Sequence, residues 1–276
     1  MSTPQITVAT ATRVGDRTAN ADAATAITNQ LGTCAAVVDG IGSTPQVCAA
    51  ARLAADVAAT VGSHRGAQAA IMAAADTMPE HPDAPNAVAA VASIEPGGRI
   101  EIAHVGDAAV WTWASPGHLT RWTADQTAGA QIDHMRTNPA LTDDDRRKLD
   151  DIVDVLGDYV LNGLKYATVS TVAWTTVRDT TPRLILLTTD GIHKVLGPGH
   201  MNGLINRHHD DPQALADALV TKAVEPGDRL AHDQYEEAMW IAVTTGASHI
   251  RPIVPLPLGD RDNATAAVIH IAHHTD

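Results

Sequence analysis

Two stretches of the chain share one pattern, an apolar run that ends in Asp, Gly and Ile. They are AAVVDGI at residues 35–41 and LLTTDGI at residues 186–192. A strand that ends in Asp-Gly is common at hairpin turns, and either copy alone would be interpreted in that way. Two further acids, Asp107 in HVGDAAVW and Asp262 in RDNATAAVI, also lie where a predicted strand meets a loop. The repeated pattern therefore predicts acidic side chains at the ends of several strands.

If these strands lie side by side, Asp39, Asp107, Asp190 and Asp262 would meet in one cleft. Carboxylates that close repel one another and lose hydration, so each would cost roughly several kcal/mol without bound cations or raised pKa values. Oxygen ligands favour Mg²⁺ or Mn²⁺ over Zn²⁺. A pair of such ions that share one carboxylate can activate a water and hold an attacked phosphoryl group.

Composition narrows the class of protein. The 276 residues are 45% hydrophobic, which suits a single globular domain over 1–276. A formal net charge of -13, without a stripe of Lys and Arg, argues against a nucleic-acid partner. The N-terminus lacks a signal-peptide pattern, and no apolar run reaches membrane-spanning length, so we expect a cytoplasmic protein without a membrane partner. Cys34 and Cys48 are too few for a disulfide framework and are interpreted as buried hydrophobes.

Hydrophobic periodicity predicts an α+β chain in which hairpins and helices form separate runs. A hairpin is expected from the runs NAVAAVASI and RIEIAHV, which a glycine turn joins. Helix N-caps are expected at Ser43, ahead of Pro45, and at Thr142, ahead of three acids. The other predicted strands are 6–12, 33–38, 183–189 and 264–272, and the predicted helices follow Ser43 or lie at 67–78, within 124–162, at 201–207 and at 211–223.

Five motifs in this order resemble metal-dependent protein serine/threonine phosphatases of the type 2C (PPM) family, in their bacterial form. The motifs are DRTANADA at 16–23, VVDGIGS at 37–43, HVGDA at 104–108, TTDGI at 188–192 and RDNATAAVI at 261–269. The resemblance spans about residues 13 to 272. It implies a β-sandwich with helices on both outer faces. It also implies hydrolysis of phosphoserine and phosphothreonine esters on proteins, by a metal-bound hydroxide at a two-metal centre.

The resemblance also implies a role for each matching residue. Asp39 would bridge two divalent cations, Mn²⁺ or Mg²⁺, and the Gly40 carbonyl would bind one of them. Asp190 and Asp262 would complete the other. A third, weaker cation would lie at Asp107 and Asp190.

Three more residues acquire roles from the same resemblance. Arg17 would grip the substrate phosphate, a task that suits the planar guanidinium group. Asp22 would orient metal-bound water. Asn263 would support Asp262 from the second layer of contacts.

The chain departs from the family pattern at several positions. Ala21 stands where the family usually has Glu, and Gln126 stands where a His usually follows Asp125. The stretch at about 224–259 is expected to be an insertion, interpreted as a peripheral helix and loop or as a surface for a protein partner. Because of Ala21, a second hypothesis stays open: a pseudophosphatase of the same fold that binds a phosphoprotein or another partner without efficient turnover.

Overall fold

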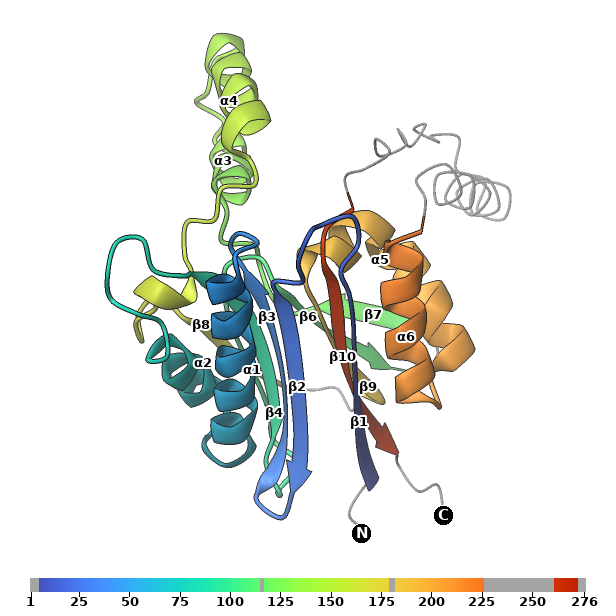
Figure 1. The fold of residues 1–276 in the computed structure, drawn as a ribbon. Helices are drawn as coiled ribbons and strands as arrows, with labels where there is room; N and C mark the ends of the chain where they lie inside the picture. Colours follow the sequence, from blue (N-terminus) through green and yellow to red (C-terminus); the bar gives the residue numbers. More distant parts are fainter. Residues whose placement is uncertain (1–4, 115–116, 179–181, 226–260, 273–276) are drawn as a thin grey trace, which may run out of the picture.

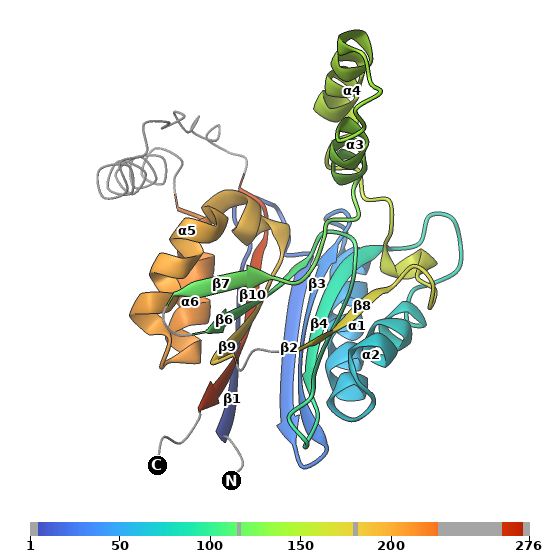
Figure 2. The ribbon, with the colours of Figure 1, turned by 180° about the vertical axis from the view of Figure 1, so that it is seen from behind.

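The structure is a computed structural model that describes residues 5–114, 117–178, 182–225 and 261–272. Two antiparallel sheets of five strands each are stacked face to face, and helices cover the outer face of each sheet (Figures 1 and 2). The expected α+β sandwich with helices on both faces is confirmed. None of the helices within the described ranges is long and apolar enough to cross a membrane.

The first sheet contains both ends of the described chain. Its strand order is β1-β10-β9-β6-β7. The bounds are β1 (Gln5–Arg13), β10 (Ala264–Ala272), β9 (Leu184–Thr188), β6 (Ala109–Ala114) and β7 (His118–Arg121). The predicted strand at 264–272 is confirmed to the residue, and the expected strands at 6–12 and 183–189 are confirmed within one residue at each end.

The second sheet is built from consecutive hairpins with one late strand at its edge. Its order is β2-β3-β4-β5-β8. The bounds are β2 (Asp22–Asn29), β3 (Gly32–Gly40), β4 (Ala87–Ile94), β5 (Ile100–Val105) and β8 (Ala173–Val177). The predicted hairpin is confirmed as β4 and β5.

Helices α1 (Pro45–Arg65) and α2 (Ala67–Ala75) cover the second sheet, while α5 (Asp190–His208) and α6 (Pro212–Ala223) cover the first (Figure 1). Pro45 lies in the first turn of α1 as predicted, but the N-cap is Thr44 and not Ser43. The Thr44 hydroxyl accepts a hydrogen bond from the Val47 amide at 3.3 Å.

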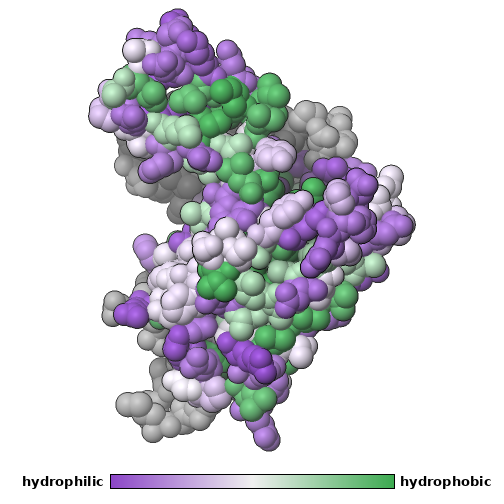
Figure 3. All heavy atoms as spheres, turned by 90° about the vertical axis from the view of Figure 1, so that its left-hand side faces the viewer, coloured by the Kyte–Doolittle hydropathy of each residue, from purple (hydrophilic) through white to green (hydrophobic). Residues whose placement is uncertain are grey.

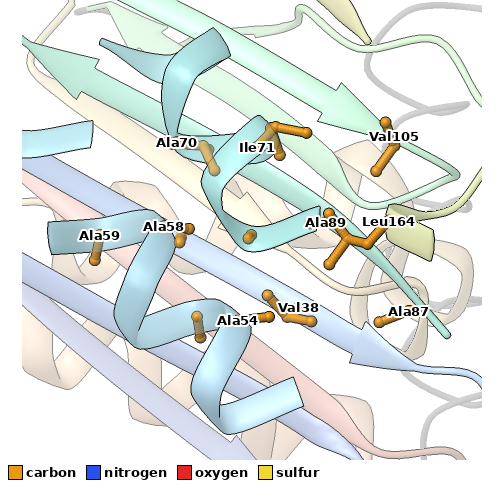
Figure 4. Packing of buried hydrophobic residues seen from close by; sticks show 14 of the residues in the cluster. Val38, Ala54, Ala58, Ala59, Ala70, Ile71, Ala87, Ala89, Val105 and Leu164 are labelled. Carbon is orange, nitrogen blue, oxygen red and sulfur yellow. The ribbon is translucent and has the colours of Figure 1, made fainter. Parts of the chain in front are cut away.

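Alanine dominates the packing of α1 against the second sheet. Figure 4 shows Ala54, Ala58 and Ala59 of α1 in one apolar cluster with Val38 of β3, and all four side chains are fully buried. Because alanine is so small, it lets a helix backbone approach the sheet closely. A separate apolar core fills the space between the two sheets, with Val37 on one side and Leu187 on the other among its members.

The excursion between β7 and β8 is a helical hairpin that stands away from the sandwich (Figure 1). The helical run expected within 124–162 is two helices, α3 (Ala128–Arg136) and α4 (Asp143–Leu156). Thr142 caps α4 through a reciprocal hydrogen-bond pair with Asp145, so that predicted cap is confirmed. A single antiparallel bridge between Thr127 and Val160 closes the base of the hairpin.

The hairpin exposes apolar surface. No residue of α4 is buried, and Figure 3 shows apolar residues across the protruding upper part of the molecule. The exposed large apolar side chains at this hairpin and its base include Met135, Ile152, Val155, Leu156 and Tyr159. The predicted insertion at 224–259 lies almost entirely outside the described residues, so it stays a prediction.

Candidate metal centre

Strand registers bring the acid-bearing loops to one edge of the sandwich. In the first sheet, Thr188 at the end of β9 lies opposite Ala266 of β10 and Ala109 of β6. Arg13, the last residue of β1, lies opposite Ala264, the first residue of β10. The loops that carry Arg17, Asp107, Asp190 and Asp262 therefore leave the first sheet at the same edge.

The second sheet contributes a pair of carboxylates at this edge. Asp39, near the end of β3, lies directly opposite Asp22, the first residue of β2. The neighbouring chain segment crosses from β5 of this sheet to β6 of the first through Gly106, Asp107 and Ala108. Since Val105 pairs with Ala89 next to the start of β4, this crossover lies on the same side as Asp39. The predicted meeting of strand-end acids is therefore observed at the level of the backbone.

Burial and mutual repulsion act on the two paired carboxyl groups. Burial raises the pKa of Asp39 well above its usual value, and the charges of Asp22, Asp190, Asp107 and Asp262 raise it further. Burial, opposed by hydrogen bonds from Thr189 and Thr265, raises the pKa of Asp22 to about 7. The pKa of each carboxyl group is raised first because burial disfavours the charged form, and then because neighbouring carboxylates repel it.

A threonine network supports Asp22 from the first sheet. The Thr189 hydroxyl donates to Asp22 Oδ2 at 2.7 Å, and it accepts a hydrogen bond from the Thr265 amide at 3.0 Å. Helix α5 begins beside this network and approaches β10 so closely that a Cβ on Gly191 would lie 2.0 Å from the Asn263 carbonyl oxygen. Glycine at 191 is therefore needed to bring Asp190 next to the start of β10.

Asp190 is the first residue of α5, where the helix dipole favours a negative charge. Its Oδ2 accepts a hydrogen bond from the Lys194 ammonium at 3.1 Å, one turn further along the helix. The same ammonium donates to Asp107 Oδ2 at 2.9 Å. Asp107 and Asp190 are thus brought together as predicted, through a lysine that the sequence reasoning did not single out.

The turn that presents Asp107 is strongly constrained. Gly106 has φ of +83°, and a Cβ there would lie 2.1 Å from Val88 Cγ1. Gln126 makes two hydrogen bonds to this turn. Its side-chain Oε1 accepts from the Gly106 backbone amide at 2.8 Å, and its backbone amide donates to the Gly106 carbonyl at 3.0 Å. The unexpected Gln126 therefore has a structural role in placing Asp107.

Asp262 and Arg17 form an ion pair at the mouth of the site. Arg17 Nη2 lies 2.8 Å from Asp262 Oδ2, with the two side chains 55% and 43% exposed. Gly15, with φ of +62°, lets the loop that carries Arg17 pass against the chain before β10, where a Cβ would lie 2.2 Å from the Asp262 carbonyl oxygen. Solvent therefore reaches Arg17, as a group that binds a substrate phosphate requires.

Asn263 is placed to hold the Arg17 loop. Its side chain accepts from the Ala21 amide at 2.8 Å and donates to the Val14 and Ala19 carbonyls at 2.7 and 3.2 Å. Its contact with Asp262 is through the backbone, because the Asn263 amide donates to Asp262 Oδ1 at 2.7 Å. Asn263 therefore contacts both Asp262 and the loop that carries Arg17.

Ala21 is buried in a small apolar cluster with Val47 and Cys48. Its backbone still ties two parts of the site together, because its carbonyl accepts from the Gly40 amide at 3.1 Å and its amide donates to Asn263. A Cβ on Gly40 would clash with Val47 Cγ1 at 2.5 Å, so this cluster packs closely on the turn after Asp39. Apolar packing therefore occupies the place where the family pattern has a carboxylate.

The donor set fits divalent cations in charge and chemistry, although it is not arranged around one. Within the described ranges, no group of three or more His, Cys, Asp and Glu side chains is positioned as it stands to hold a metal ion. Asp190 is turned to Lys194 and Asp262 to Arg17. The buried Asp22 and the half-buried Asp39 have no ion-pair partner among the described residues, and hard oxygen donors at such a place suit Mn²⁺ or Mg²⁺.

Solved bacterial phosphatases share this architecture. The PPM Ser-Thr phosphatase MsPP from Mycobacterium smegmatis, solved in complex with cacodylate, is 18% identical, with a TM-score of 0.62 over 96% of this chain and 98% of that chain. The S. agalactiae serine/threonine phosphatase is 13% identical, with a TM-score of 0.67 over 97% and 100%. This chain has the PPM phosphatase fold. The catalytic domain of the phosphatase PstP, solved with two manganese ions, aligns with 17% identity and a TM-score of 0.57 over 97% and 99%.

The similarity of this chain to PPM phosphatases lies in the three-dimensional fold. No protein-family model and no curated protein matches the sequence. The fold brings the five sequence motifs to one edge of the sandwich.

Several residues of the site were missed by the sequence reasoning. Thr189 precedes Asp190 in the motif TTDGI, and the threonine doublet is the local signal that marks it. Lys194 lies four residues after Asp190, which becomes meaningful only when a helix is known to begin at Asp190. Asp158 and Thr265 meet the site only through the tertiary fold, and no local pattern marks them.

Proposed function

We propose that the chain is a metal-dependent protein phosphatase that hydrolyses phosphoserine and phosphothreonine esters. The observation that carries the proposal is the carboxylate pair of the buried Asp22 and the half-buried Asp39, beside a solvent-accessible arginine at the same edge. A site with excess negative charge next to Arg17 is suited to a phosphate only when cations lie between them. The PPM fold, shared with solved serine/threonine phosphatases, supports this proposal.

Two divalent cations, Mn²⁺ or Mg²⁺, would be held by Asp39, the Gly40 carbonyl, Asp190 and Asp262. Bound there, they would supply an acidified water as nucleophile and neutralise charge on the phosphoryl group. The solved PstP domain with two manganese ions supports this choice. Binding would require Asp262 to give up part of its contact with Arg17, whereas Asp190 bonds Lys194 through Oδ2 and could bind a cation through Oδ1.

The chain's own residues would have separate tasks. Arg17 is half-exposed and would orient two phosphate oxygens with its guanidinium group. Asn263 would hold the Arg17 loop in place, while Thr189 would keep Asp22 directed at Asp39. Hydrolysis of a phosphomonoester requires a reduction of the barrier on the order of 20 kcal/mol, so positioning by Arg17 must act together with the cations.

The competing proposal is a pseudophosphatase that binds a phosphoprotein without efficient turnover. Its support is Ala21, which replaces the Glu usual in the family and lies in an apolar cluster. The chain has an aspartate at each of the metal-binding positions 39, 190 and 262, and this favours an active phosphatase over a pseudophosphatase. We also propose that the insertion at 224–259 binds a protein partner and that the protein acts in the cytoplasm.

The deciding experiment is a phosphatase assay on p-nitrophenyl phosphate and a phosphothreonine peptide. The purified chain is assayed with Mn²⁺, with Mg²⁺ and with chelator. Two variants are assayed in parallel: Asp39→Asn and, as a matched control, Asp210→Asn. Asp210 lies on the exposed surface, where it pairs with Arg183 and His209. Metal-dependent turnover that Asp39→Asn abolishes and Asp210→Asn preserves would support the enzyme. Mn²⁺ binding by folded protein without turnover would favour the pseudophosphatase.

A further inference from the structure

Lys194 places a positive charge inside the acidic edge of the site. Its Nζ lies 2.9 Å from Asp107 Oδ2, 3.1 Å from Asp190 Oδ2 and 3.1 Å from Asp158 Oδ1. An ammonium group has three N–H donors, and here each has a carboxylate acceptor. The acceptors come from the β5–β6 turn, the start of α5 and the base of the helical hairpin. One side-chain nitrogen thus joins three separate parts of the fold.

The burial of these groups shows which contacts matter. The Asp107 side chain is 5% exposed and that of Lys194 is 36% exposed, whereas Asp158 is 93% exposed. A buried carboxylate requires a counter-charge, and Lys194 supplies it to Asp107. Burial alone would lower the pKa of Lys194, but the charges of Asp190 and Asp107 outweigh it and leave the pKa above its usual value. The ammonium form is therefore the one that this cluster stabilises.

This arrangement does not fit the third cation that the sequence resemblance implied at Asp107 and Asp190. A divalent ion between these two carboxylates would have to displace the two hydrogen bonds that they accept from Lys194, and it would be repelled by the remaining ammonium charge. We propose that the Lys194 ammonium is itself the third cation of this site, built into the chain, so that no divalent ion binds between Asp107 and Asp190. The inference deepens the proposed function and rests on it only for the two cations at Asp39.

The built-in cation has a structural consequence that a dissociable ion lacks. Because Asp158 lies two residues after the end of α4, its contact with Lys194 connects the base of the helical hairpin to the first turns of α5. Because Asp158 is 93% exposed, this contact is weak, but it does not depend on a divalent ion. The orientation of the hairpin relative to the site should therefore be independent of a third divalent ion.

The test counts bound Mn²⁺ in the full chain by calorimetric titration and by electron paramagnetic resonance of free Mn²⁺. Lys194→Gln and Lys194→Met remove the charge at similar side-chain length, and we expect each to bind one more Mn²⁺ per chain than the unaltered protein. Adding Asp107→Asn to Lys194→Gln should abolish that gain. Lys148→Gln is the control, since Lys148 is an exposed residue of α4 that pairs with Asp144. Equal Mn²⁺ counts in the folded Lys194 variants and the unaltered chain would overturn the proposal.

A second measurement needs no variant and remains decisive if the Lys194 variants fail to fold. The unaltered chain is acetylated by an amine-reactive ester with and without saturating Mn²⁺, and the rate at each lysine is read by mass spectrometry. Lys194 should react slowly in both conditions, relative to exposed Lys148. A several-fold faster reaction of Lys194 in Mn²⁺ would show that the metal displaces the ammonium, and the proposal would be wrong.

The outcomes separate this inference from the proposed function. If the unaltered chain binds no Mn²⁺ but Lys194→Gln binds one, the two-metal proposal fails and the role of Lys194 stands. If the unaltered chain and the variant both bind two, the role of Lys194 fails and the two-metal proposal stands. Three Mn²⁺ in the unaltered chain would also overturn the role of Lys194.

Discussion

Asp22 and Asp39 lie directly opposite each other on adjacent antiparallel strands, with both carboxyl groups on the same face of the second sheet. Like charges in that arrangement destabilise a sheet. The pair is retained where strand ends from both sheets meet, and the pKa of each member is raised. The Asp22–Asp39 pair therefore lowers the stability of the metal-free fold while providing carboxylates for cations, and substitution of one member can separate these two effects.

Asp39→Asn should abolish metal-dependent turnover and at the same time stabilise the metal-free protein. The amide keeps the shape of the side chain but removes the charge that four neighbouring carboxylates repel. We expect the melting temperature in chelator to rise by a few degrees, while added Mn²⁺ stabilises the variant less than the unaltered chain. Calorimetry with and without Mn²⁺ measures both effects, and a lower melting temperature in chelator would contradict the repulsion argument.

Arg17→Ala should weaken substrate use more than it affects folding. The side chain is half-exposed, and its pairing with Asp262 contributes little to stability. Loss of charge-assisted hydrogen bonds to a phosphate is expected to lower kcat/KM by about tenfold or more. The matched control is Arg207→Ala in the last turn of α5, away from the site edge. Unchanged kcat/KM for a phosphopeptide would remove Arg17 from the phosphate-binding role.

Gly191→Ala should destabilise the protein although it adds only one methyl group. The new Cβ would lie 2.0 Å from the Asn263 carbonyl oxygen, so α5 and β10 must separate. We expect a loss of about 2 kcal/mol or more in the free energy of unfolding, together with weaker Mn²⁺ binding. Gly97→Ala is the control, because a Cβ at that position would meet no atom within 4 Å. Equal denaturation midpoints for the two variants would contradict this close approach.

His193 should make the protein less stable in mild acid. It is buried beside Thr188, and burial lowers its pKa to about 3, whereas an unfolded chain has a value near the reference of 6.5. Between those two pH values the unfolded state binds more protons, so stability is present above pH 6.5 and falls as the pH drops toward 3. This one group contributes a loss of about 2 kcal/mol at about pH 5 relative to about pH 8.

The measurement compares urea denaturation of the unaltered chain and of His193→Gln from about pH 8 to about pH 5, in chelator throughout. The variant should lose less stability than the unaltered chain over this range, because glutamine does not titrate. His81→Gln, at an exposed position, is the control and should follow the unaltered chain. Parallel pH profiles for His193→Gln and the unaltered chain would show that His193 is accessible to protons in the folded state.

The acids at strand ends could be predicted from sequence because a strand end is a local pattern. An apolar run that stops at Asp-Gly marked Asp39 and Asp190, and the start of β10 marked Asp262. The partners of these acids could not be predicted in that way. Lys194 becomes a partner of Asp107 only because β5 crosses to β6 beside the first turn of α5, and that arrangement is set by the pairing of distant strands.

Helix boundaries show the same division. Predicted helices at 201–207 and 211–223 correspond to α5 and α6, but α5 begins eleven residues earlier, at Asp190. Gly197 has a non-helical φ of +69° and is followed by Pro198, so α5 contains a break. Local signals at that break hid the first part of the helix, which packing of Ile192 into the core maintains. The short strands β7 and β8 carried too few residues for a periodic signal.

The bridge between Thr127 and Val160 closes the helical hairpin at its base, so the hairpin can move independently of the two sheets. The chain leaves and rejoins the sandwich at adjacent points, so every contact within α3 and α4 is local in sequence. Such a segment can open and close as a unit without breaking the ladders of either sheet. Exchange of its amide protons can therefore be fast while the strands below it remain protected, and changes in its length need not slow the folding of the rest of the molecule.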